Sequence, residues 1–197
     1  MFRRIKNMIL ATGDTVRFQT SLQRMFDKLP QPFQIIQGEA IDIVHWKSWP
    51  VDGVSYYLTK GLAGVRIRNE CKDCDIYVRQ EIGIGIRSTE EGFDASRFLK
   101  ALAEEAIELN RGFGNRLAYD YHYGPYFVGA PHSLAGFYCV ENAWISATAV
   151  VDSCLPPIRI VDLFPITIGE LQEERSDPDL FWKRIAERDV DLMNFRR

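Results

Sequence analysis

The chain has 197 residues, a mass of 22.7 kDa and a formal net charge of −3 at pH 7. A single domain of this size buries about 70% of the surface of its unfolded chain, which allows a full hydrophobic core. The small acidic excess argues against a dedicated nucleic-acid-binding protein, and no apolar run approaches the ~18 residues that a membrane helix requires.

The N-terminal segment has no clear periodicity. We expect residues 1–13 to be a loosely ordered lead-in to a single domain that spans residues 1–197. Basic residues between Phe2 and Lys6 are typical of the start of a signal peptide, but the apolar segment Met8–Ala11 that follows is too short. We therefore expect a cytoplasmic protein with no membrane partner.

The first half of the chain is predicted to form one helix and then a run of strands. Asp14 can cap a helix whose apolar residues share one face, namely Phe18, Leu22, Met25, Phe26 and Leu29. Runs of β-branched and aromatic residues between turn residues predict strands at Phe33–Ile36, Ala40–Trp46, Val54–Lys60, Val65–Arg68, Asp75–Arg79 and Glu81–Arg87.

The last of these strands contains alternating isoleucine and glycine. Side chains alternate between the two faces of a strand, so Ile82, Ile84 and Ile86 share one face and Gly83 and Gly85 share the other. Glycine within a strand often marks the close approach of another element. We expect a helix or an aromatic side chain to lie flat on the glycine face.

Cysteine spacing leaves one question open. Cys71-x-x-Cys74 has the spacing of a zinc knuckle or a redox pair, but Cys139 and Cys154 are too far apart to form a second knuckle. We expect thiols in a reducing compartment, with no metal and no cofactor. Whether Cys71 and Cys74 have a redox or metal role stays open.

The clearest predicted helix runs from Asp94 to Asn110. Asp94 is the expected N-cap, and Phe93 and Phe98 occupy the positions of a hydrophobic staple. The predicted buried stripe consists of Phe98, Leu99, Leu102, Ala106 and Leu109, and the expected terminators are Gly112 and Gly114.

The segment that follows this helix is rich in aromatic residues. We single out Tyr119, Tyr121, His122, Tyr123, Tyr126 and Phe127 as a hypothetical partner-binding set, because aromatic residues supply contact area at little entropic cost. The alternative is an edge strand whose tyrosines cover the core. Further strands are expected at Phe137–Val140 and Trp144–Val151.

The segment Ile158–Leu171 predicts a buried strand that turns into a capped helix. Its first half is an apolar run, and Thr167 with Glu170 has the spacing of a capping box. Ile166 and Leu171 can close over the cap as a hydrophobic staple. Asp177-Pro178 then predicts the start of a last helix.

Several of these segments resemble the Suppressor-of-fused-like (SUFU) domain family. The closing motif Phe164-Pro165-Ile166-Thr167 with Glu170 is similar to the family's "hydrophobic–Pro–Ile–Thr–x–x–Glu" segment. Val54–Leu62 resembles an early family strand that ends in "Thr–x–Gly–hydrophobic", and Asp75–Arg79 resembles the next strand. The resemblance runs from about Ser55 to the C-terminus.

This resemblance implies an α+β domain with a mixed, mostly antiparallel sheet and packed helices. It also implies a protein-binding function without catalysis, since SUFU domains in animals hold a transcription factor of the Hedgehog pathway. Small bacterial relatives include immunity proteins that neutralise a cognate toxin. We therefore expect a bacterial, stand-alone domain that binds another protein, and a toxin is one candidate partner. The resemblance does not give the oligomeric state.

The alternative function class is a small hydrolase or a metal-dependent enzyme. It would use His122 and His132 with the nearby Asp120 and Cys139. None of these residues lies in a recognised nucleophile motif. An enzyme requires the four side chains to converge in one pocket.

Overall fold

The computed structural model describes residues 15–68, 77–87, 93–120, 134–145, 158–187 and 193. The helices are α2 (Thr15–Asp27), the short 3₁₀ helix η1 (Leu62–Gly64), α3 (Ala95–Leu109), α4 (Ile168–Ser176) and α5 (Pro178–Glu187). The strands are β1 (Gln34–Ile36), β2 (Asp42–Lys47), β3 (Val54–Lys60), β4 (Ile67–Arg68), β5 (Tyr77–Arg87), β6 (Leu117–Asp120), β7 (Leu134–Glu141) and β8 (Ile158–Thr167).

The strands form one mixed sheet in the order β1-β2-β3-β5-β8-β7-β6, with β4 paired to β5 beside this path. Strands β5 and β8 are parallel, whereas the other described strand pairs are antiparallel. The predicted α+β class with a mostly antiparallel sheet is confirmed.

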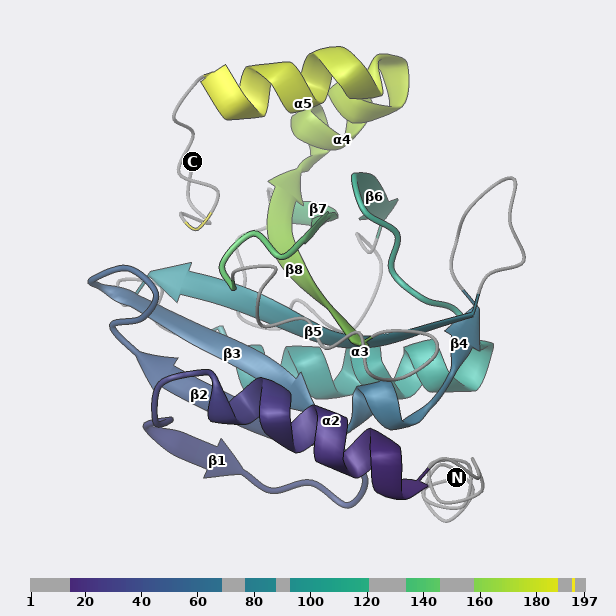
Figure 1. Ribbon diagram of the computed structural model, residues 1–197. Helices are drawn as coiled ribbons and strands as arrows, with labels where there is room; N and C mark the ends of the chain where they lie inside the picture. Colours follow the sequence, from purple (N-terminus) through teal and green to yellow (C-terminus); the bar gives the residue numbers. More distant parts are fainter. Residues whose placement is uncertain are drawn as a thin grey trace.

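Helices cover both faces of the sheet (Figure 1). Helix α3 packs one apolar face against β2, β3 and β5, and α2 lies on the opposite face near η1. Helices α4 and α5 lie at the far end of β8, where α4 contacts β6, β7 and β8. The core is therefore divided among three clusters, and the cluster beneath α4 and α5 is separate from the one beneath α2.

The predicted helix caps are present. Thr167 Oγ1 accepts from the Glu170 N–H at 3.3 Å, and Glu170 Oε2 accepts from the Thr167 N–H at 2.7 Å, which completes the capping box. Ile166 and Leu171 are both buried in the cluster beneath α4. Asp94 Oδ1 accepts from the Arg97 N–H at 3.0 Å, and Asp177 Oδ1 accepts from the Leu180 N–H at 2.9 Å.

Several strand boundaries differ from the prediction. The expected break at Gln80 is absent: β5 runs without interruption from Tyr77 to Arg87, and Gln80 Oε1 accepts from the Phe113 N–H at 3.3 Å. Strand β8 continues through Phe164 and Pro165 to Thr167, because residues 164–167 pair with β7.

The end of α3 differs as well. Leu109 is 56% exposed, and the buried stripe instead includes Ala103 and Ile107. The helix ends at Asn110, whose φ of 51° places it in the left-handed region. The two glycines that were expected to end the helix lie beyond it, and Gly112 donates its N–H to the Arg68 carbonyl at 2.6 Å.

Aromatic residues cover the glycine face of β5, as expected. Tyr56 passes over Gly83, and its hydroxyl donates to Asp162 Oδ1 in β8 at 2.6 Å. Trp144 approaches Gly85, where an added Cβ would lie 3.5 Å from the indole ring. The absence of a side chain at Gly83 is what lets a residue of β3 reach a residue of β8 across the intervening strand.

A buried carboxylate holds η1 against β5. Glu81 Oε1 accepts from the N–H groups of Gly61 at 2.9 Å and Ala63 at 3.2 Å, and Glu81 Oε2 accepts from the Thr59 hydroxyl at 2.6 Å. Two residues earlier, buried Arg79 donates to the carbonyls of Ala63 and Gly64. Burial raises the pKa of Glu81 to about 7 despite these hydrogen bonds.

The glycine face gives a stability prediction. Gly83→Ala should cost about 1–3 kcal/mol, because its methyl group would overlap the Tyr56 hydroxyl and lie 3.0 Å from Asp162 Oδ1. Gly85→Ala is the matched control and should cost less, since its nearest neighbours would lie at 3.4–3.5 Å. Urea denaturation of both variants measures the difference. Equal midpoints would show that Tyr56 does not restrict Gly83.

The buried carboxylate gives a pH prediction. The pKa of Glu81 is higher in the folded protein than its ordinary value of 4.5, so the folded state binds more protons between pH 4.5 and about 7. Stability should therefore fall as pH rises through this window, by at most about 1.4 kcal/mol per pH unit for this group.

The test compares the unfolding free energy of wild type and Glu81→Gln from pH 4 to pH 8. The variant should lose the part of the slope that Glu81 causes and keep the part due to Asp162, whose pKa burial raises to about 6. Parallel curves would contradict the assignment to Glu81.

Candidate protein-binding surface

Helices α4 and α5 are positioned by the end of β8. The pairing of β8 with β5 ends at Leu163, and the last residues of β8 pair with β7 up to Thr167 opposite Leu134. The capping box at Thr167 then starts α4 directly from the strand. The helix pair is consequently held at one end of the sheet, away from α2 and α3 (Figure 1).

A single residue links α4 to α5. Asp177 is extended, with φ −154° and ψ 90°, and Pro178 begins the next helix. Proline disfavours helical geometry in the residue before it and suits the first position of a helix. The Asp177 N–H still donates to the Glu173 carbonyl at 3.0 Å, so the turn is tight.

Helix α5 is anchored to the sheet by aromatic contacts. The ring of Phe181 meets that of Tyr138 in β7 edge-on at 5.2 Å, and Trp182 stacks on the same tyrosine at 6.0 Å. The Arg116 guanidinium lies over the Trp182 ring at 4.9 Å. These contacts leave the opposite side of α5 facing solvent.

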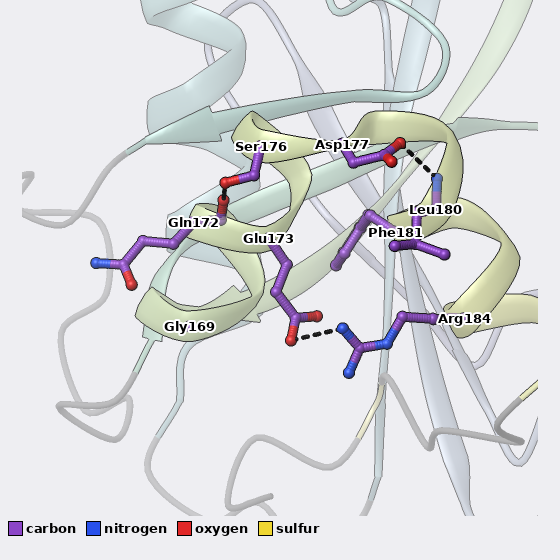
Figure 2. A pocket seen from close by; sticks show the side chains of 8 residues that line it. All are labelled: Gly169, Gln172, Glu173, Ser176, Asp177, Leu180, Phe181 and Arg184. Carbon is purple, nitrogen blue, oxygen red and sulfur yellow. Dashed lines mark hydrogen bonds and ion pairs between the residues drawn. The ribbon is translucent and has the colours of Figure 1, made fainter.

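An open hollow of about 410 Å³ lies between the two helices. Its lining consists of Gly169, Gln172, Glu173, Ser176, Asp177, Leu180, Phe181 and Arg184. Glu173 of α4 and Arg184 of α5 meet across it with an N–O distance of 2.8 Å (Figure 2). Half-exposed Leu180 supplies its apolar surface, and the lining residue Phe181 is buried in the core.

The helix pair is strongly acidic relative to the rest of the chain. Residues 168–187 contain six carboxylates and three cations, so they carry a net charge of −3, which equals that of the whole chain. Each cation has a carboxylate partner: Arg184 contacts Glu173, Lys183 contacts Glu187, and Arg175 contacts Asp120.

Of the proposed aromatic binding set, Tyr119 lies in the described residues. It is 4% exposed, stacks on Phe137 at 5.4 Å and accepts from the Gly114 N–H at 2.8 Å. Tyr119 is thus a core residue of edge strand β6, which is the alternative considered for this segment. Tyr121, His122, Tyr123, Tyr126 and Phe127 lie outside the described residues.

The described members of the enzyme alternative do not come together. Cys139 is fully buried in the core and faces Leu117 in the β6–β7 register, whereas Asp120 pairs with Gly136 at the other end of β6. Asp120 is bound to Arg175 at 3.0 Å. His122 and His132, like Cys71 and Cys74, lie outside the described residues.

The described residues contain no group of three or more His, Cys, Asp or Glu side chains placed to hold a metal ion. None of the helices in this part of the chain combines the length and hydrophobicity needed to cross a membrane. Of the motif residues, Phe164 and Pro165 lie within β8, and Thr167 and Glu170 form the capping box that starts α4.

The hollow itself was not predicted from the sequence. The cap at Asp177 and the proline after it were identified, but the tight link between the two helices was not recognised as the cause of a surface depression. The available signal was Leu180, an apolar residue that follows Pro178 and Asp179 in the first turn of α5 and is half exposed.

No protein-family model and no curated protein matches the sequence of the chain. Solved structures do match. One is a chain of the Sufu–Fu complex crystal structure, with a TM-score of 0.60, 10% identity and coverage of 91% of both chains.

A second match is a protein described as a SUFU (suppressor of fused protein) homologue from Neisseria gonorrhoeae FA 1090. Its TM-score is 0.58 at 14% identity, over 92% of this chain and 93% of that chain. The chain therefore has a SUFU-like fold.

Proposed function

We propose that this protein is a non-enzymatic, cytoplasmic binding domain for another protein, and that it acts as a bacterial immunity protein that neutralises a cognate toxin. The observation that carries the binding function is the fold shared with a protein crystallised in the Sufu–Fu complex. The immunity role rests on the resemblance to small bacterial SUFU-like proteins.

The placement of the candidate catalytic residues supports binding over catalysis. A nucleophilic cysteine must be accessible and held near a base, yet Cys139 is fully buried among apolar side chains. Asp120 is bound to a cation of α4 and does not face Cys139.

The proposed binding surface combines the outer side of α4 and α5 with the aromatic segment 121–127. Asp120, the residue before this segment, is bound to Arg175 of α4. Tyr119 is left out of the surface because its ring is in the core. Tyr121, Tyr123, Tyr126, Phe127 and His122 remain proposed contact residues.

The binding function is tested by affinity capture from host-cell extract with the tagged full-length chain, followed by calorimetry with the purified partner. We expect a saturable complex with one protein. Tyr123→Ala and Tyr126→Ala, once shown to be folded, should each weaken it about 30-fold, corresponding to the ~2 kcal/mol of an interface anchor.

The immunity role has its own measurement. The captured partner, expressed alone in a test bacterium, should stop growth, and co-expression of this chain should restore it. A partner that binds tightly but does not affect growth would leave the binding function and remove the immunity role. Failure to capture a saturable partner would contradict both.

A further inference from the structure

We infer that the hollow between α4 and α5 receives an apolar side chain of the partner protein, flanked there by lysine or arginine. This inference rests on the proposed protein-binding function and adds the chemistry of the partner and the place where it binds.

Two apolar side chains at or beside the hollow lie outside the hydrophobic core. Leu180 is 51% exposed at the hollow, and Ile168, next to the lining residue Gly169, is 42% exposed. The core beneath these helices is already filled by Leu171 and Phe181. Binding that covers Leu180 would remove apolar surface from water and so be favourable.

The hollow also has room for a side chain. A Cβ added at Gly169 would meet nothing within 4 Å, so this part of the lining faces open space. Six of the eight lining residues are exposed, and the two others are buried Phe181 and half-buried Arg184. Small-molecule sites bury most of their ligand, whereas this open shape suits a side chain presented by a protein.

The negative charge of the α4–α5 helix pair favours a basic partner. The helix pair carries a net charge of −3, and the charged lining residues of the hollow, Glu173, Asp177 and Arg184, carry a net charge of −1. The lining cation Arg184 is already bound to Glu173. An acidic surface attracts a basic partner and disfavours an acidic one, and this attraction weakens with salt.

The probes are three synthetic peptides titrated into the ¹⁵N-labelled full-length chain and followed by amide NMR shifts. Their sequences are Lys-Lys-Leu-Lys-Lys, Glu-Glu-Leu-Glu-Glu and Lys-Lys-Gly-Lys-Lys. We expect the first to shift the amides of Gly169, Leu180, Phe181 and Arg184, and the other two to bind at least about tenfold more weakly. Shifts elsewhere, or equal binding of all three, would overturn the inference.

Matched variants separate the hollow from general surface effects. Gly169→Leu should fill the hollow without loss of stability, since leucine is a better helix former than glycine. Leu180→Ser removes the apolar contact, and Leu109→Ser is its control at a similarly exposed helix position on α3. Glu173→Gln removes a carboxylate from the hollow, and Glu108→Gln is its control at an exposed position on α3. The hollow variants should weaken peptide binding at least about tenfold and the controls less than twofold.

The same variants, tested with the captured partner, distinguish the two proposals. Unchanged partner binding by Gly169→Leu and Leu180→Ser would overturn this inference and leave the protein-binding function. Peptide binding at the hollow, with no cellular partner captured, would support the hollow as a binding site and contradict the proposed function. Self-association of the wild type that Leu180→Ser abolishes would assign the hollow to a second copy and overturn the inference.

Discussion

The hydrogen bond between Tyr56 and Asp162 is the interaction on which the arrangement of the sheet depends. It connects β3 to β8 across β5 at an Oη–Oδ1 distance of 2.6 Å, and it is possible because Gly83 has no side chain in its path. The second carboxylate oxygen accepts from the Trp144 N–H at 3.1 Å. Both side chains are fully buried, and a buried carboxylate without such partners would cost several kcal/mol. The register that satisfies Asp162 is therefore strongly favoured over its alternatives, because a slip of one residue would turn this carboxylate to the opposite face.

That register decides what the end of β8 presents to solvent. With Asp162 opposite Gly83, the strand leaves its pairing with β5 after Leu163 and ends at the capping box of Thr167. The acidic helix pair and its hollow follow directly, anchored by Phe181 on Tyr138. A surface built this way is held by a rigid strand and needs little ordering when it binds, which favours affinity. The fold thus links the buried hydrogen bond between Tyr56 and Asp162 to the surface proposed for the partner.

Local signals allowed much of this fold to be predicted from the sequence. The caps at Asp94, Thr167 and Asp177 rely on short-range hydrogen bonds that one residue and its near neighbours specify. The continuity of β5 was not predicted because polar Gln80 separates two predicted strands, and its hydrogen-bond partner Phe113 is distant in the sequence. Asp162 lies within an apolar run, and its hydrogen-bond partner Tyr56 is 106 positions away. The sequence alone therefore does not identify Asp162 as a buried, hydrogen-bonded carboxylate. The hollow depends on how two helices diverge from Asp177, which side-chain periodicity does not describe.

The most direct test of this account is a double-mutant cycle on the unfolding free energy with Tyr56→Phe, Asp162→Asn and the double variant at pH 7. The pKa of Asp162 is about 6 and that of Tyr56 is raised by burial, so at this pH the tyrosine donates to a carboxylate. Hydrogen bonds to a charged group contribute about 1.5–3 kcal/mol, and we predict a coupling energy in this range. A coupling near zero would mean that the two side chains act independently, and it would contradict the view that their hydrogen bond fixes the register of β8.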